Sequence, residues 1–336
     1  MHLSQDAHAI VMACSYVGID RRSALQPLTL KEWNALVVKM SDSVFSTPTG
    51  LLGQSAEILQ KELQLSVEEA QRLAKLLDRG GAAAFALQQL DDQGLWIVTR
   101  ADDNYPPRFK EKLKSQAPVV LFGAGRLALV DRKGVAIVGS RAVSENDPAG
   151  KFTERIAELC ARDKLNVISG GAKGVDIISM RTVLQRDGKA IGVMSDSLAK
   201  KIREREARQY VMEERMLLLS PFHPDAGFQV ANAMSRNKMI YALADYAVVV
   251  SSDFEKGGTW AGAIENLRQK YSPLFVRTGD DVPEGNRKLL EKGGLPLELH
   301  EQERSGVSLE SFLELKSTPE QVSLKVADRQ FDLFEK

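Results

Sequence analysis

The sequence predicts an α/β protein in which a mostly parallel sheet is covered by helices, preceded by a small helical domain. From Arg132 onward, short apolar runs rich in β-branched residues alternate with amphipathic segments of helical length. This alternation is typical of a parallel sheet that is buried on both faces. Residues 1–100 show helical periodicity but no alternation with strand-like apolar runs. The predicted fold is therefore an extended Rossmann-like, doubly wound sheet with an added N-terminal domain.

The change of pattern divides the chain into three parts. The 336 residues suffice for two domains. We expect a helical domain over 1–100, an α/β domain over 101–304 and a polar C-terminal tail over 305–336. The tail ends in Phe331-Asp332-Leu333-Phe334, which resembles a docking motif. The tail is either an ordered terminal helix or a flexible peptide that docks on a partner.

The N-terminal part contains several short amphipathic helices. We expect two of them over 30–40 and 53–63. A capping box follows, with Ser66 as the N-cap and Glu69 reaching back to it. Apolar residues then recur at helical spacing, and Gly80-Gly81 is expected to end this helix.

The α/β part is predicted from its short apolar runs and the amphipathic segments between them. We expect strands over 94–100, 119–122, 135–138, 166–169, 190–194, 216–219, 246–250 and 273–276. We expect helices over 148–162, 174–186, 198–214, 230–243 and 259–269.

Composition limits the possible partners and the compartment. The 45 Lys and Arg residues are balanced by 45 Asp and Glu residues, so a phosphate-binding surface has to be a local patch. Only Cys14 and Cys160 are present, which excludes a disulfide framework and fits a reducing compartment. No signal peptide and no membrane-spanning apolar run is evident. We therefore expect a cytoplasmic protein without a membrane partner.

Two glycine-rich turns directly follow predicted strands. The first is Gly139-Ser140-Arg141, and the second runs from Ser169 through Gly174. A glycine turn between a strand and a helix presents free backbone N–H groups and can bind an anion. Neighbouring parallel strands would bring both turns to one crevice. The alternative is that the glycines only make tight connections, but the cations Arg141 and Lys173 favour anion binding.

Two further clusters extend this pattern. A third glycine turn, Gly257-Gly258-Thr259, follows the strand predicted over 246–250, and a predicted helix carries Ser235-Arg236-Asn237-Lys238. An arginine fork can bind two phosphate oxygens at once. The predicted phosphate-binding residues are Gly139, Ser140, Arg141, Ser169, Gly170, Gly171, Lys173, Gly174, Arg236, Asn237, Lys238, Gly257, Gly258 and Thr259.

Several common catalytic and cofactor motifs are absent from the sequence. There is no G-x-x-x-x-G-K-[ST] loop, and the first turn is not G-x-G-x-x-G. The four histidines are scattered and none forms a metal-spaced pair. No cofactor, metal or catalytic residue is therefore expected, and the sequence favours a binding protein over an enzyme.

The ordered series of motifs resembles the DprA/Smf family of DNA-processing proteins. The series is G-S-R at 139–141, S-G-G-A-K-G-V-D at 169–176, S-R-N-K at 235–238, G-G-T at 257–259 and G-N-x-x-L-L at 285–290, with Tyr105-Pro106-Pro107 before it. The resemblance implies an extended Rossmann fold and an N-terminal domain of the SAM or helix-hairpin-helix kind. It also implies single-stranded DNA binding, a homodimer, and a RecA-type recombinase or another DNA-processing protein as partner. The DNA-binding residues that it implies are Arg141, Ser169, Gly170, Lys173, Arg236 and Lys238.

A second resemblance leaves an alternative open. Gly257-Gly258-Thr259 and Glu265 are similar to part of the signature of LOG-type phosphoribohydrolases, which belong to the same wider superfamily. That resemblance implies a nucleoside monophosphate as substrate, with Arg141 and Glu265 as catalytic residues. A third possibility is a nucleotide-binding sensor. A long open groove would indicate a DNA strand, and a closed pocket would indicate a nucleotide.

Overall fold

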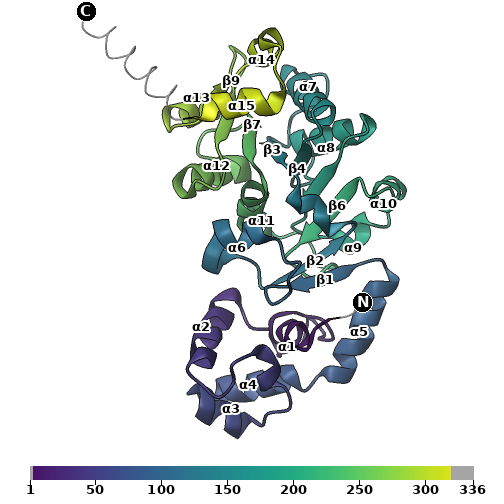
Figure 1. The fold of residues 1–336 in the computed structure, drawn as a ribbon, viewed down its shortest axis with the longest axis vertical. Coiled ribbons are helices and arrows are strands. Elements are labelled where there is room, and N and C mark those ends of the chain that lie inside the picture. Colours follow the sequence, from purple (N-terminus) through teal and green to yellow (C-terminus); the bar gives the residue numbers. More distant parts are fainter. Residues whose placement is uncertain (1–2, 319–336) are drawn as a thin grey trace, which may run out of the picture. The chain divides into compact units, whose positions relative to one another are not determined.

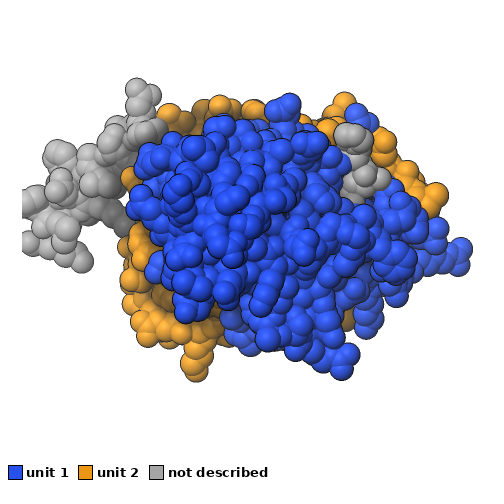
Figure 2. Space-filling model, turned by 90° about the horizontal axis from the view of Figure 1, so that it is seen from below, with its two compact units in different colours: residues 1–127, 194–211, 218–232 blue, residues 128–193, 212–217, 233–336 orange. Residues whose placement is uncertain are grey.

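The computed structural model of the protein describes residues 3–318 (Figure 1). Its strands are hydrogen-bonded in the order β1-β2-β6-β5-β4-β3-β7-β8-β9, in one nine-stranded sheet. The chain forms two compact units, which Figure 2 colours separately. Unit 1 comprises residues 1–127, 194–211 and 218–232, and unit 2 comprises residues 128–193, 212–217 and 233–336. The predicted α/β class with a mostly parallel sheet is confirmed.

Unit 1 begins with a group of short helices. They are α1 (Gln5–Cys14), α2 (Leu30–Ser41), the 3-10 turn η1 (Pro48–Leu51), α3 (Ala56–Leu63), α4 (Val67–Leu77) and α5 (Gly80–Asp92). The predicted capping box is present, because the side chains of Ser66 and Glu69 each bond to the backbone N–H of the other residue.

The expected role of Gly80-Gly81 is wrong, because these glycines begin α5 and do not end the helix before it. Helix α4 stops earlier, at Leu77. The Arg79 guanidinium donates to the Leu76 carbonyl at 2.9 Å and to the Val17 carbonyl at 2.7 Å. A side chain therefore satisfies a helix-end carbonyl here, and no glycine cap is needed.

The rest of unit 1 contains the antiparallel part of the sheet. Strand β1 pairs antiparallel with β2, and β2 pairs antiparallel with the end of β6. Unit 1 also contains β1 (Trp96–Thr99), α6 (Pro107–Leu113), η2 (Lys114–Gln116), β2 (Val120–Ala124), α9 (Leu198–Lys201), most of α10 (Arg205–Met212) and the end of β6 (Met216–Ser220). The 3-10 turn η3 (Leu127–Asp131) begins at the last residue of this stretch and belongs otherwise to unit 2.

The single helix predicted over 198–214 is wrong, because two short helices, α9 and α10, occupy this stretch. The amides of Arg203 and Glu204 bond to carbonyls three residues back, at Lys200 and Lys201. Such bonds tighten the last turn of a helix and end it. The charged periodicity of the stretch does not show this break.

Unit 2 contains a parallel sheet with the order β5-β4-β3-β7-β8-β9. Its strands are β3 (Gly134–Gly139), β4 (Asn166–Ser169), β5 (Ala190–Val193), β7 (Tyr246–Ser251), β8 (Leu274–Arg277) and β9 (Leu295–Leu297). Its helices are α7 (Pro148–Arg162), α8 (Val175–Gln185), α11 (Val230–Leu243), α12 (Gly257–Gln269), α13 (Glu284–Glu291), α14 (Leu299–Ser305) and α15 (Leu309–Ser317). The predicted helices over 148–162 and 230–243 have these same bounds in the structure.

The order in which the chain adds strands to the sheet reverses between β3 and β7, although the two strands are parallel. From β3 the chain proceeds outward through β4 and β5, and it later returns to β7 on the other side of β3 before continuing to β8 and β9. In open parallel sheets, such a switch point opens a crevice at the carboxyl ends of the two strands.

The part of the expected tail that the structure describes is ordered as helix α15. Leu309, Phe312 and Leu313 are buried, and the Leu309 amide donates to the Asp163 carboxylate. The predicted docking motif at Phe331–Phe334 lies outside the described residues. The division of the chain into domains at residues 100 and 304 remains a proposal.

Among residues 3–318, every helix is too short or too polar to cross a lipid bilayer.

Candidate anion-binding site

Three turns leave the sheet of unit 2 from neighbouring strands. Strands β4, β3 and β7 lie side by side in parallel and end at Ser169, Gly139 and Ser251. We call the segments that carry the predicted residues the Arg141 turn (139–142), the Lys173 turn (169–174) and the Thr259 turn (256–259). The carboxyl ends of parallel strands meet at one edge, so all three segments follow the same edge at the switch point.

The Arg141 turn is anchored to the end of β7. The Ser140 amide donates to the Ser251 carbonyl at 2.9 Å. The pairing of β3 with β7 shifts register after Val138, so that Gly139 lies opposite Ser251. The Ser140 hydroxyl accepts from the Ala142 amide at 3.2 Å, and Arg141 itself is exposed. The turn therefore has a fixed backbone and an exposed cation.

The Lys173 turn contacts the Arg141 turn through backbone atoms. Gly174 has φ +86, and a Cβ there would lie 2.4 Å from the Ser140 carbonyl oxygen, so only glycine fits. The Ser169 hydroxyl donates to the Ile137 carbonyl at 2.7 Å and is buried in the sheet. Lys173, by contrast, is exposed. The structure thus brings the two predicted cations to adjoining turns, while the Ser169 hydroxyl is occupied inside the sheet.

Asp176 holds the Lys173 turn, although it is not among the predicted binding residues. Its Oδ2 atom accepts from the amides of Gly170 at 3.1 Å and Ala172 at 3.4 Å. The side chain is buried, and burial raises its pKa, although the nearby Arg236 charge and the two amide bonds favour the carboxylate. The signal in the sequence was its place in the first turn of a helix after a glycine run.

Arg236 reaches the same turn from α11. It is only 4% exposed, and a Cβ on Gly170 would lie 1.8 Å from its Nη1 atom. The guanidinium therefore lies directly against the Gly170 backbone, and its charge acts on Asp176. The prediction of a phosphate-binding Arg236 assumed an accessible fork, but the structure places that fork in the protein interior.

The residue after Arg236 connects α11 to the Thr259 turn. Asn237 Nδ2 donates to the Gly258 carbonyl at 3.0 Å. Helix α12 begins at Gly257, two residues before the predicted start at 259, and Gly257 enters it with φ +75, a conformation that glycine tolerates. Gly258, Thr259 and Lys238 are each half-buried. Helix α11 therefore contacts the Lys173 turn through Arg236 and the Thr259 turn through Asn237.

Two other glycines are required by close packing or by backbone conformation. A Cβ on Gly139 would lie 2.5 Å from the Val175 side chain at the start of α8. Gly171 has φ +67, in the left-handed region that glycine tolerates. Glycines such as Gly139 and Gly174 therefore allow the close connections that the sequence offered as the alternative to anion binding.

Trp260 and Glu265 lie in α12, and Glu265 is the residue on which the phosphoribohydrolase alternative depends. The Trp260 ring packs edge-on against Phe254, with 5.1 Å between ring centroids, and is half-buried. Burial raises the pKa of the Tyr241 hydroxyl, and the charges of Asp176 and Glu265 raise it further. Among residues 3–318, no group of three or more His, Cys, Asp or Glu side chains is placed to hold a metal ion.

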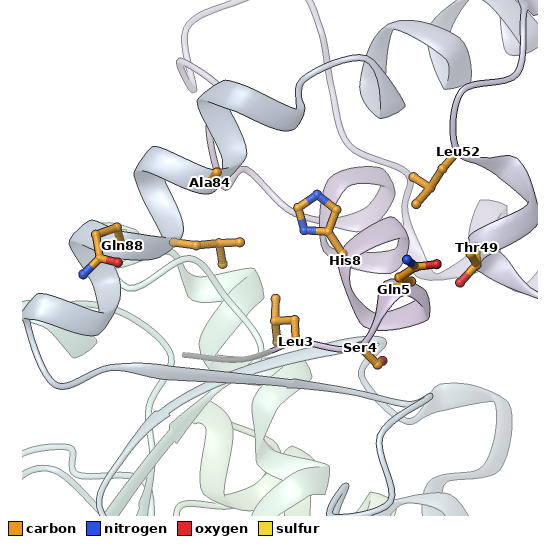
Figure 3. A pocket seen from close by; sticks show the side chains of 9 residues that line it. Leu3, Ser4, Gln5, His8, Thr49, Leu52, Ala84 and Gln88 are labelled. Carbon is orange, nitrogen blue, oxygen red and sulfur yellow. The ribbon is translucent and has the colours of Figure 1, made fainter.

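A separate pocket of about 760 Å³ lies in unit 1 (Figure 3). Figure 3 shows side chains of α1, including His8, and of α5, including Gln88, around it. Its lining residues are Leu3, Ser4, Gln5, His8, Thr49, Leu52, Ala84, Leu87 and Gln88. None of them is a predicted site residue, and no motif in the sequence indicates this pocket.

The fold and the strand-end turns define a Rossmann-like α/β protein with a candidate anion site at its switch point. The family model of DNA recombination-mediator protein A matches residues 96–302. The chain belongs to this family, which confirms the resemblance inferred from the ordered motifs.

Two curated relatives illustrate the similarity. The chain is 30% identical over 198 residues to DNA processing protein DprA of Streptococcus pneumoniae, covering 57% of this chain and 67% of the relative. It is 25% identical over 242 residues to Protein Smf of Escherichia coli, covering 71% of this chain and 63% of the relative. The matched part thus spans about two thirds of the length of these relatives.

Two solved structures resemble the fold. The structure of DprA from Streptococcus pneumoniae superposes with a TM-score of 0.57 at 19% identity, covering 88% of this chain and 95% of that chain. A structure of DNA processing protein A from Helicobacter pylori, described in terms of its single-stranded DNA binding mode, superposes with a TM-score of 0.52 at 25% identity. That match covers 63% of this chain and 96% of the other.

Proposed function

We propose that this protein binds single-stranded DNA at the edge of its parallel sheet, in DNA processing or recombination. The observation that carries the proposal is the convergence of the Arg141 and Lys173 turns at the switch point, with exposed cations on a fixed backbone. Membership of the DNA recombination-mediator protein A family and the single-stranded DNA described for the Helicobacter pylori relative support it.

The geometry assigns different tasks to the predicted residues. Arg141 and Lys173 are exposed and contact phosphate oxygens. The amides of Ser140, Gly170 and Ala172 already donate to groups within the protein, so they hold the turns in place and are not assigned to the phosphates. Arg236 is buried, so it acts by fixing the Lys173 turn and by adding positive potential. Contacts to phosphates carry no sequence information, so binding is general with respect to base sequence.

The proposal extends to partners and location. The family resemblance supports a homodimer, a RecA-type recombinase or another DNA-processing protein as partner, and a cytoplasmic location. The alternatives of a nucleotide sensor and a phosphoribohydrolase use the same edge of the sheet. They differ in requiring a single nucleotide, whereas a strand spans several phosphates.

The direct test is a fluorescence-anisotropy titration of the purified full chain with a labelled oligo-thymidine strand and with a duplex of equal length. We expect saturable binding to the single strand and weaker binding to the duplex. Nucleoside monophosphates are added as competitors to separate the alternatives. A mononucleotide that displaces the strand at micromolar concentration favours a nucleotide pocket, and an absence of strand binding refutes the proposal.

A further inference from the structure

Asn286 belongs to the G-N-x-x-L-L motif at 285–290, which is part of the family resemblance but has no predicted binding role. It lies in the first turn of α13 and is fully buried. Its side chain makes three hydrogen bonds to backbone atoms of other elements. Oδ1 accepts from the Ser252 amide at 2.8 Å, and Nδ2 donates to the carbonyls of Val250 at 3.1 Å and Arg277 at 3.0 Å. All of these partners lie at the carboxyl ends of β7 and β8.

This position is where the regular ladder of the sheet ends. The paired residues of β7 and β8 run as far as Val249 and Val276. Beyond them the backbone groups of β7 need other partners, because buried polar groups are costly when unpaired. The amide of an asparagine offers a donor and an acceptor together, so Asn286 continues the hydrogen bonding of β7 past its last paired residue.

The glycine before Asn286 brings α13 close to the same segment. A Cβ on Gly285 would lie 2.1 Å from the Ser252 carbonyl oxygen, so a larger residue would force α13 away. Gly285 and Asn286 therefore fix the backbone at Ser252 together. Ser251 directly precedes Ser252, and its carbonyl accepts a hydrogen bond from the Ser140 amide of the Arg141 turn at 2.9 Å.

We infer that Asn286 is a positioning residue for Arg141, acting through the end of β7. The connection runs from the Asn286 amide to Ser252, through the backbone to Ser251, and across the hydrogen bond to Ser140. Asn286 itself is buried and does not contact DNA. The effect on DNA affinity rests on the proposed function, whereas the effect on the Arg141 turn does not.

The test compares Asn286→Ala with Asn266→Ala as a matched control. Asn266 is equally buried and also both accepts from and donates to backbone, at Ser272, near the far end of α12. Hydrogen exchange measured by mass spectrometry reports on the peptide that contains Ser140. We expect about tenfold faster exchange of that peptide in Asn286→Ala and no change in Asn266→Ala, because a lost buried hydrogen bond opens its neighbourhood locally.

DNA affinity provides the second readout. We expect Asn286→Ala to weaken single-stranded DNA binding about fivefold, and to have almost no further effect in the Arg141→Ala background, because residues in one network are not additive. Asn286→Leu is close to asparagine in shape, carries no donor or acceptor and introduces no buried charge, so it is the second variant if Asn286→Ala does not fold. A purely structural role predicts equal losses in both backgrounds.

The possible outcomes separate the two claims. Unchanged exchange at Ser140 in both Asn286 variants overturns the positioning role, whatever the DNA affinity. Wild-type protein that binds no DNA overturns the proposed function, while faster exchange at Ser140 would still support the positioning of the Arg141 turn. Additive losses with Arg141→Ala overturn the link to DNA binding.

Discussion

The Arg236 guanidinium occupies the space that a side chain on Gly170 would need, with 1.8 Å between Nη1 and a Cβ built on the glycine. Arg236 belongs to α11 and Gly170 to the turn after β4, so the contact joins segments far apart in the sequence. It makes a buried arginine part of the support for a turn that is proposed to bind phosphate.

This contact predicts the effect of Gly170→Ala. The added methyl group collides with the buried end of the Arg236 side chain, which has to shift within the protein interior, so we expect a loss of about 1–3 kcal/mol in the free energy of unfolding. DNA binding should weaken as well, because the Lys173 turn shifts. Gly81→Ala is the control, since nothing lies within 4 Å of a Cβ there. Urea denaturation measures both, and equal stability of the two variants would contradict the geometry.

Asp176 predicts a pH dependence of stability. Its pKa is raised by burial in the folded protein, so the folded state holds this proton more tightly than the unfolded state, where the pKa is about 3.9. The contribution of Asp176 to stability is therefore greatest below that unfolded value and is lost as pH rises through the folded value. We expect the difference in unfolding free energy between wild type and Asp176→Asn to decline from acidic toward neutral pH. A difference that grows over this range would show a lowered pKa.

The exposed cations predict a loss of DNA affinity that is independent of base sequence. Arg141→Ala and Lys173→Ala should each weaken binding by a similar factor for oligo-thymidine and for mixed sequences, since each removes a phosphate contact. Arg132→Ala is the control, because Arg132 is exposed just before β3 begins, at the other end of that strand. Loss of affinity for one sequence alone would indicate base contacts and would overturn the phosphate assignment.

Glu265 allows the enzyme alternative to be tested. We expect no release of free base when the wild-type protein is incubated with the common nucleoside monophosphates, followed by chromatography. Glu265→Gln should then leave DNA binding unchanged, because the charge of Glu265 acts on Tyr241 and Tyr271, and neither is a proposed DNA-binding residue. Base release that disappears in Glu265→Gln would establish the hydrolase in place of the binding protein.

Much of the fold could be predicted because its signals are local. The apolar runs of β3, β4 and β7 and the periodicity of α7 and α11 are visible in the sequence, and so are the glycines that follow the strands. Strand β9 and helix α13 were not predicted, because β9 is a short strand that pairs with β8 alone and α13 is strongly charged.

The supporting contacts of the site could not be predicted, because they are tertiary. Arg236 looks like a surface phosphate ligand in the sequence, and its burial depends on where α11 packs. The same applies to Asn286, whose three backbone partners come from β7, β8 and the turn after β7. The cations that stay exposed, Arg141 and Lys173, were predicted from their place in glycine turns.

The most direct test of the central claim is the salt dependence of single-stranded DNA binding by wild type and by the double variant Arg141→Ala/Lys173→Ala. If the two turns neutralise phosphates, the logarithm of affinity falls linearly with the logarithm of salt concentration, with a slope of about −0.7 for each phosphate contact. The double variant should bind more weakly, and its slope should be shallower by about 1.4, the value for two lost contacts. An affinity that does not respond to salt, or an unchanged slope in the double variant, would contradict phosphate binding at these turns.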